Sequence, residues 1–295
     1  MLKKDERMPV SYRIRIATPK KYLLDGLWFG AKKPRRIIVW VHGLSSSAFS
    51  QSHMVSALAD ERTAVVTFNN RGFEKVAKLR RAGELRSKQV GGAHEVFTEC
   101  VDDIQGAVNF ARRAGAKDIY LVGHSTGCQK SAYWAYRKAG GRGVKGIVLL
   151  APVADYEAGL KMYGKARIEK AIRAARALVR RGKARELLPQ SVWPETLDAQ
   201  RFLSLNLPDS VEQSIFSYFE PHRASRVLRG VKVPLFAAVA EKDEYAITPA
   251  QDIVAWLRKE SRARRLETLV VRGASHGFRG HERSLARAIK RFIAE

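Results

Sequence analysis

Cysteine is scarce in this chain of 295 residues, which contains two, Cys100 and Cys128. Their spacing matches neither a metal-ligand motif nor a disulfide framework, so we expect two buried free thiols, no metal and a cytoplasmic location. No run of about 18 apolar residues occurs, which excludes an ordinary transmembrane helix. The basic start, Met1 to Arg7, precedes no apolar stretch, and we expect no signal peptide.

Acidic residues are also few: 29 Asp and Glu stand against 54 Lys and Arg, for a net charge of +25. Such a charge occurs in proteins that bind nucleic acid, anionic membrane surfaces or acidic substrates. Neither RNP aromatics nor a zinc knuckle accompanies it, and the cations are spread along the chain, with a denser stretch at 161–185. A solvated basic surface is therefore the simplest explanation, and no specific nucleic-acid partner is expected.

Short apolar runs alternate with helical periodicity along most of the chain. The strand candidates are 37–41, 64–68, 119–122, 147–150, 233–239 and 269–271, and the helical segments are 96–113, 249–259 and 283–293. Two earlier segments, 10–16 and 22–29, look like antiparallel strands, the second turning at Asp25-Gly26. Strands alternating with helices predict an α/β fold with a doubly wound, mainly parallel sheet.

One segment, residues 155–221, offers no strand candidate and interrupts this alternation. We expect it to be a helical lid inserted into a core formed by residues 1–154 and 222–295. Its aromatic second half, from Trp193 to Phe219, is expected to line the substrate pocket. Its first half carries a basic helix between Lys165 and Arg181, best explained as a solvated face, with attraction of an anionic substrate or membrane surface as alternatives.

The residues that indicate chemistry are Gly123-His124-Ser125-Thr126-Gly127. This G-x-S-x-G pattern follows a strand-like run and precedes a helix-compatible one, which is the setting of a nucleophile on a sharp turn. Small residues also cluster at ordinary helix starts, where a serine caps the first turn. The strand before and the helix after favour Ser125 as a catalytic nucleophile.

A nucleophilic serine needs a base, and the base needs an orienting carboxylate. His276 follows the last strand candidate between glycines, so it should lie at the same sheet edge as Ser125. For the carboxylate we choose Asp243, in the loop after 233–240, with Glu241 and Glu244 as alternatives. The chain order is then serine, aspartate, histidine.

An oxyanion formed during acyl transfer needs preorganised N–H donors. One should be the amide of Thr126, directly after the nucleophile. The other should come from the loop after 37–41, where Gly43 allows the backbone to turn and Leu44 is the expected donor. The serine run that follows can instead cap the next helix. This set of groups requires no cofactor.

From about Val10 to its end the chain resembles the α/β-hydrolases. The residues that carry the resemblance are Val41-His42-Gly43, Phe68–Gly72, Gly123–Gly127, Leu149–Pro152, Asp243 and His276. The serine departs from the dehalogenase and epoxide-hydrolase branches, which use aspartate. The chain is similar to esterases of the serine-aminopeptidase-like, monoglyceride-lipase-like and cinnamoyl-esterase-like groups, and, through Asn69–Gly72 and Gly91-Gly92, to siderophore-ester hydrolases.

These observations predict a hydrolase that cleaves carboxylic esters of small molecules, anionic ones included, through an acyl-enzyme intermediate. A siderophore-ester hydrolase and a carbon–carbon bond hydrolase would use the same triad and remain alternatives. A peptidase would need acidic residues near the lid to hold a substrate amine, and the lid is basic. From another class, a nucleic-acid or membrane-surface binding protein on a hydrolase scaffold would explain the charge.

Overall fold

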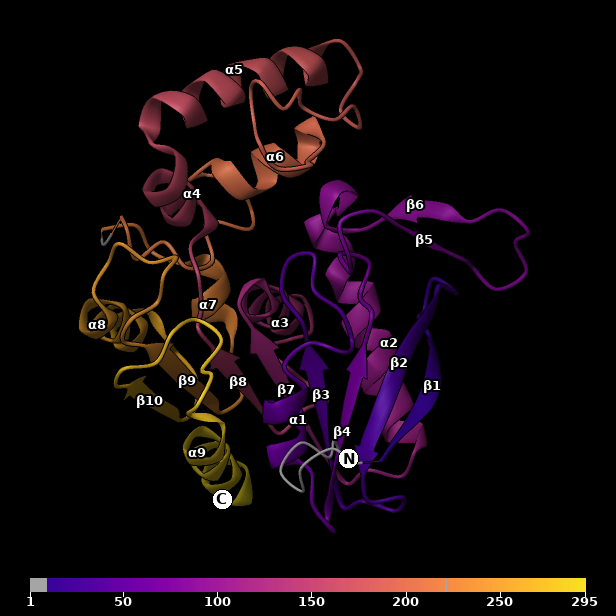
Figure 1. The fold of residues 1–295 in the computed structure, drawn as a ribbon. Coiled ribbons are helices and arrows are strands. Elements are labelled where there is room, and N and C mark those ends of the chain that lie inside the picture. The colour runs from indigo at the N-terminus through magenta and orange to yellow at the C-terminus, as the bar shows by residue number, and fades with distance from the viewer. Residues whose placement is uncertain (1–9, 221) are drawn as a thin grey trace, which may run out of the picture.

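The computed structural model describes residues 10–220 and 222–295, and its centre is an eight-stranded sheet (Figure 1). The strands, in the order in which they lie, are β1 (Ser11–Ala17), β2 (Leu23–Gly30), β4 (Thr63–Phe68), β3 (Arg36–Val41), β7 (Asp118–His124), β8 (Gly146–Leu150), β9 (Leu235–Ala240) and β10 (Leu266–Val271). The β1–β2 and β2–β4 pairs are antiparallel and the others parallel. The predicted mainly parallel α/β sheet is confirmed. The expectation for Met1 to Arg7 lies outside the described residues.

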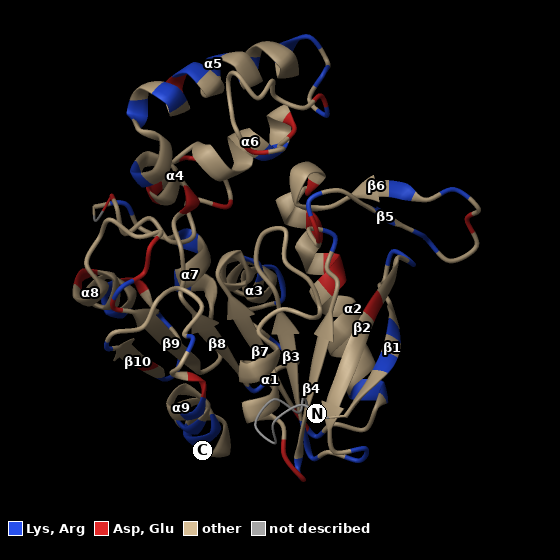
Figure 2. Ribbon diagram, in the orientation of Figure 1, with Lys and Arg blue, Asp and Glu red and all other residues tan. Residues whose placement is uncertain are grey.

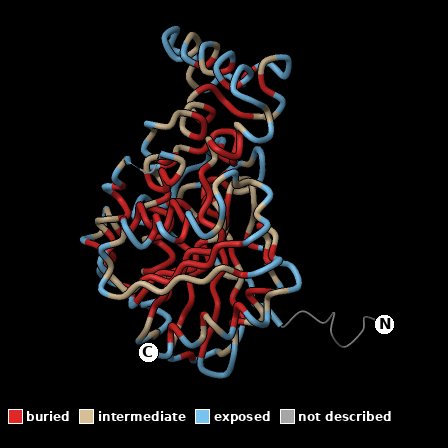
Figure 3. The backbone as a smooth tube through the Cα atoms, turned by 90° about the vertical axis from the view of Figure 1, so that its left-hand side faces the viewer, coloured by how far each residue is buried: buried red, intermediate tan, exposed pale blue. Residues whose placement is uncertain are grey.

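Alternate side chains of the central strands enter two cores, one on each face of the sheet. On β3, Ile37 and Val39 join one core, while Ile38 and Trp40 join the other. The first core is covered by α2 (Cys100–Arg113), α3 (Thr126–Arg137), α7 (Arg226–Gly230) and α8 (Ala250–Glu260). The second is covered by α1 (Ser52–Leu58) and α9 (Glu282–Ala294). Figure 3 shows the sheet as a buried layer between these helices. Strands buried on both faces explain the fully apolar runs in the sequence.

The turn predicted at Asp25-Gly26 is wrong, because β2 runs straight through these residues. The chain reverses earlier, where Lys21 N donates to Thr18 O at 2.8 Å. A Cβ at position 26 would lie 2.3 Å from Thr67 O on β4, so Gly26 is required by the close approach of two strands. A second feature that the sequence did not reveal is a hairpin of β5 (Ala77–Leu79) and β6 (Lys88–Val90), which projects beside the sheet (Figure 1).

Residues 155–220, here called the insertion, contain three helices above the carboxyl ends of the central strands (Figure 1). They are α4 (Asp155–Tyr163), α5 (Lys165–Arg180) and α6 (Ala199–Asn206). The insertion has its own apolar cluster, in which Trp193 packs edge-on against Tyr163 and Phe202 with ring centroids 4.6 and 4.8 Å apart. The division of the chain into core and lid stays a prediction, and its boundary residue 221 lies outside the described residues.

The basic helix α5 turns a narrow apolar stripe inward and its cations outward. Ile168, Ala171 and Ala175 are buried, while Lys and Arg follow the outer side (Figure 2). Among the described residues, no helix combines the length and apolarity needed to cross a membrane. Cys100 and Cys128 are both buried and free.

Candidate active site

Ser125 stands at the junction between β7 and α3 in a backbone conformation that serine rarely adopts. Its φ is 56° and its ψ is −130°. Two backbone hydrogen bonds hold it there, from Ser125 N to Leu150 O at 3.0 Å and from Cys128 N to Ser125 O at 2.8 Å. Strained residues of this kind persist only where the surroundings over-determine them, and they gather at functional sites.

The glycines on either side of Ser125 are required by the tightness of this turn. A Cβ on Gly123 would lie 2.3 Å from Gly127 O, and one on Gly127 would lie 2.1 Å from Val41 O. Both distances are far below van der Waals contact, so neither position accepts a larger residue without a backbone shift. The G-x-S-x-G spacing thus has a direct steric cause in this fold.

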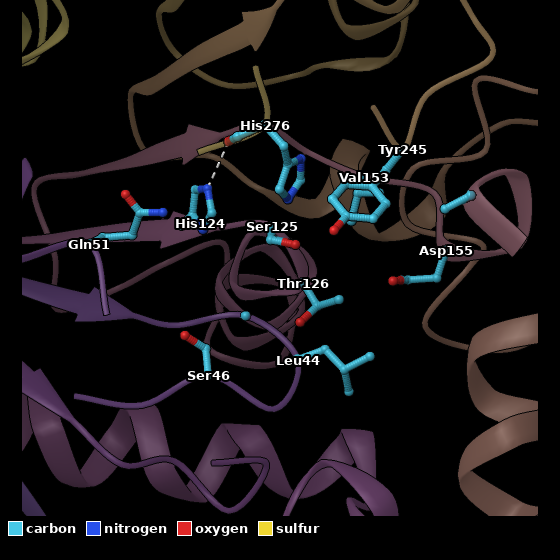
Figure 4. A pocket seen from close by; sticks show the side chains of 12 residues that line it. Leu44, Ser46, Gln51, His124, Ser125, Thr126, Val153, Asp155, Tyr245 and His276 are labelled. Atoms are coloured by element: carbon cyan, nitrogen blue, oxygen red, sulfur yellow. Dashed lines mark hydrogen bonds between the residues drawn. The ribbon is translucent and has the colours of Figure 1, made fainter. Parts of the chain in front are cut away.

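Ser125 opens into a cavity of about 290 Å³ at the carboxyl ends of the strands. Figure 4 shows its lining, to which the loops after β3, β8, β9 and β10 contribute as well as the turn itself. Of the predicted site residues, Ser125, His276, Leu44 and Thr126 line this cavity. Asp243 lies behind His276. The structure therefore brings all five together, while their chemical roles stay predictions.

The three carboxylates that the sequence left open have three different partners. Asp243 Oδ2 is 2.8 Å from His276 Nδ1. Glu244 Oε2 accepts from the backbone N–H of His276 at 2.9 Å, and Glu241 Oε2 accepts from Gly273 N at 2.7 Å. Of the three carboxylates, only Asp243 contacts the imidazole, and the two glutamates accept from the backbone of the histidine loop.

Two aromatic side chains fix the position of His276. Tyr245 presents its ring to the imidazole at a centroid distance of 4.8 Å and an interplanar angle of 80°. His124 Nε2 is 3.0 Å from His276 O, an acceptor, so this nitrogen carries the proton and donates it (Figure 4). Burial, and next the proximity of His276, lower the pKa of His124 to about 4, which keeps it neutral near pH 7. The sequence gave no sign of this support from His124.

The loop that follows β3 lies directly against Ser125. A Cβ on Gly43 would come within 2.9 Å of Ser125 Cβ, so only glycine fits at this approach. Leu44 comes next and lines the cavity together with Thr126. Within residues 10–220 and 222–295, neither the Leu44 nor the Thr126 amide donates to a protein acceptor. Both are available to an oxygen atom in the cavity.

Asp155, the first residue of α4, is a polar group in the cavity that the sequence analysis missed. Its Oδ2 accepts from Gln129 Nε2 and Gln213 Nε2, each at 3.1 Å. Its carboxyl points toward the space beside Ser125 and Thr126 (Figure 4). Burial, and next the proximity of Glu212, raise its pKa to about 7. The available signal was a carboxylate shortly after the end of β8, at the same sheet edge as the serine.

A family model described as a protein of unknown function, DUF1749, matches residues 92–294. The chain belongs to this family. No curated protein matches it. Among solved structures, DcsB in complex with its substrate analogue is 14% identical at a TM-score of 0.69, over 97% of this chain and 98% of that one. A thermostable carboxyl esterase from Bacillus coagulans, in complex with glycerol, is 12% identical at a TM-score of 0.65, with 97% and 98% covered.

A third structure, Est1E from Butyrivibrio proteoclasticus with bound ferulic acid, is 16% identical at a TM-score of 0.63, with 95% and 98% covered. At these identities the likeness shows the fold, which is that of the α/β-hydrolases, as the sequence resemblance predicted. In the described part of the chain, no three His, Cys, Asp or Glu side chains are placed to hold a metal ion.

The prediction that aromatic residues of the insertion line the pocket is wrong. Trp193 and Phe202 fill the apolar cluster of the insertion, and Phe216 and Tyr218 pack into the main core. A segment this small must use its large side chains to bury its own interior. The insertion residues that line the cavity are Asp155 and Ala158.

The residues that suggested a siderophore-ester hydrolase have internal partners. Arg71 is buried and pairs with Asp102 at 2.6 Å and with Asp103 at 2.7 Å. Asn69 accepts a hydrogen bond from Ala48 N at 2.7 Å. The cavity lining includes neither of them, so this motif offers nothing to a substrate there.

Proposed function

We propose that this protein hydrolyses carboxylic esters of small molecules, with Ser125 as the nucleophile of an acyl-enzyme mechanism. The observation that carries the proposal is the strained backbone of Ser125 between β7 and α3, in one cavity with His276. The names of its structural neighbours, which include a carboxyl esterase from Bacillus coagulans and a monoacylglycerol lipase from Paleococcus ferrophilus, agree with it.

In this proposal Ser125 Oγ attacks the ester carbonyl while His276 accepts the hydroxyl proton. Asp243, 2.8 Å from Nδ1, keeps that nitrogen protonated, which leaves Nε2 free to act as base. It also stabilises the imidazolium that forms. His276 then protonates the leaving alkoxide and afterwards activates the water that releases the acid from Ser125.

The amides of Leu44 and Thr126 would bind the oxyanion. Thr126 is the first residue of α3, so its N–H also benefits from the positive end of the helix dipole. The close approach of Gly43 to Ser125 would hold the Leu44 amide near the nucleophile. Each such donor is worth roughly 10²–10³ in rate.

Asp155 would select among esters by accepting a hydrogen bond from a substrate hydroxyl group. Its Oδ2 is occupied by two glutamine amides, and its other oxygen accepts from no described group. The molecules named with two structural neighbours, ferulic acid and glycerol, both carry hydroxyl groups. The insertion would then act as a lid that contributes Asp155 from above the cavity.

A panel of p-nitrophenyl esters tests this function. We expect saturable hydrolysis of short acyl esters, loss of activity in Ser125→Ala, and a preference for 3-hydroxybutyrate over butyrate that Asp155→Asn weakens. Turnover of a carbon–carbon bond substrate in preference to every ester would reassign the reaction while retaining the triad. Full ester hydrolysis by Ser125→Ala would refute the proposal.

A further inference from the structure

Lys130 is a buried cation behind the nucleophile that the ester mechanism does not use. It lies on α3, five residues after Ser125, and its side chain is 0% exposed. Its Nζ is 2.6 Å from Glu95 Oε1 and donates to Asn70 Oδ1 at 3.2 Å. A buried ammonium is costly unless it is paired, so this arrangement requires both partners.

From Lys130 a chain of contacts leads to the loop that carries Leu44. Asn70 Nδ2 donates to His42 O at 3.3 Å, and Asn70 N donates to His42 Nε2 at 3.2 Å. Because Nε2 accepts, the ring proton is on Nδ1, which donates to Gly43 O at 2.8 Å. Burial, and next the proximity of Lys130, lower the pKa of His42 to about 3, so this tautomer persists near neutral pH.

The bond to Gly43 O sets the direction of the Leu44 amide. In a trans peptide the C=O of one residue and the N–H of the next point in opposite directions. Holding Gly43 O toward His42 therefore turns the Leu44 N–H away from it, and Leu44 lines the cavity. Ser46 N also donates to Gly43 O, at 3.4 Å, so the His42 bond is the shorter of the two that orient the proposed oxyanion donor. Asn70 in turn holds the His42 ring.

On its other side, Lys130 is linked to the insertion. Glu95 Oε2 is 2.9 Å from Arg201 Nη2 on α6, and Arg201 also pairs with Glu212. Burial alone would raise the pKa of Glu95. The neighbouring cations Lys130 and Arg201 outweigh burial and hold this pKa below its ordinary value. These contacts form a buried row of two cations, Lys130 and Arg201, and two anions, Glu95 and Glu212. The row crosses from the main core into the insertion.

We propose that Lys130 is a positioning residue, which acts through Asn70 and His42 to aim the Leu44 amide and which Glu95 ties to the insertion. This inference rests on the proposed function, since it assumes that Leu44 binds the oxyanion. Buried ion pairs add little net stability, and their best-supported use is to fix one geometry. Asn70, part of the motif that gave the siderophore resemblance, thereby gains a role.

The test replaces Lys130 and its partner together, as Lys130→Met/Glu95→Gln, so that no single charge is left buried alone. The control is Arg229→Met/Glu260→Gln, which also removes a cation together with its carboxylate partner. This pair joins α7 to α8, with Arg229 Nε 2.8 Å from Glu260 Oε2, and its arginine is partly exposed. For the first variant we expect kcat for a p-nitrophenyl ester to fall about 10- to 100-fold, the size of a small misplacement of a catalytic group. KM should stay within about threefold.

Two further measurements separate positioning from general damage. A trifluoromethyl ketone, whose tetrahedral adduct needs the oxyanion donors, should lose affinity in step with kcat, while a planar amide analogue should not. Hydrogen exchange of the 40–46 peptide should accelerate in the Lys130 variant and not in the control. This exchange readout needs no activity, so it distinguishes failure of the inference from failure of the proposed function. Unchanged kcat, adduct affinity and exchange in a folded variant would overturn the inference.

Discussion

His276 Nδ1 and Asp243 Oδ2 lie 2.8 Å apart although 33 residues separate them along the chain. The contact forms because β9 and β10 are parallel neighbours, so the loops after both strands meet at one edge of the sheet. The same loops are tied by Glu244 to His276 N and by Glu241 to Gly273 N. Asp243 is thus the one of these three carboxylates that contacts the imidazole.

Asp243→Asn should lower kcat by about 10⁴, the size of the loss when an orienting aspartate is replaced in a serine protease. An amide at this position no longer holds the proton on Nδ1. Glu244→Gln and Glu241→Gln keep an acceptor for their backbone partners and should stay within about tenfold, or about 1.4 kcal/mol in the barrier. Steady-state kinetics on one ester decides this. A larger loss at either glutamate would assign the role to that residue instead.

Gly43→Ala should reduce kcat at least tenfold, because the new methyl group would lie 2.9 Å from Ser125 Cβ and 3.2 Å from His124 O. The loop must then withdraw and take the Leu44 amide with it, and a shift of about 1 Å can cost about 10² in rate. Gly277→Ala is the control, since its methyl group meets only Gln51 Nε2, at 3.6 Å. Equal kinetics of the two variants would show that Gly43 does not hold the Leu44 amide in place.

The ionisation of Asp155 should appear in the stability of the protein. Its folded-state pKa of about 7 lies above the ordinary value of 3.8, so the folded state binds the proton more tightly than the unfolded state. Stability from this group therefore falls as pH rises from about 4 to about 7. Asp155→Asn, which cannot ionise, should gain Tm over the parent protein at pH 8 and not at pH 4. A Tm difference that does not change with pH would contradict the assigned shift.

The cations of α5 should not steer substrates. They face outward, and no α5 residue lines the cavity. Replacing Arg173, Arg176 and Arg180 with Gln should change kcat/KM equally for a neutral and a carboxylate-bearing ester at low salt, where a Debye length of about 30 Å at 0.01 M would reveal attraction. A selective, salt-sensitive loss for the anionic ester would show steering. Loss of tight binding to duplex DNA or anionic vesicles would instead support a second, binding role.

The sheet could be predicted from the sequence because short runs such as 37–41 are apolar on both faces, and few other structures bury such a run. The serine turn could be predicted because the steric demands of Gly123 and Gly127 are local. The turn at Gly26 was predicted wrongly because glycine occurs both in turns and where two strands approach closely. The β5–β6 hairpin could not be predicted from the sequence because its strands are short and half exposed.

Contacts between distant segments set the rest of the site. Which of Asp243, Glu241 and Glu244 reaches the imidazole depends on how two loops meet, and spacing alone carries no such information. In the sequence, Asp155 looks like an ordinary acidic residue in the first turn of a helix. Its position in the cavity depends on Gln213, which is 58 residues away and holds its carboxyl. In the sequence, Lys130 looks like a solvated helix residue. Its buried position becomes evident only in the structure, where Glu95 lies beside it.

Covalent labelling of Ser125 tests the central claim most directly. A fluorophosphonate should react with the folded protein at one site, and mass analysis of the peptide around residues 123–127 should place the adduct on Ser125. The Ser125→Ala protein should remain unlabelled while unfolding at a temperature close to that of the parent. Labelling of Ser125→Ala at the parental rate, or a folded parent that hydrolyses esters without labelling at Ser125, would contradict the account.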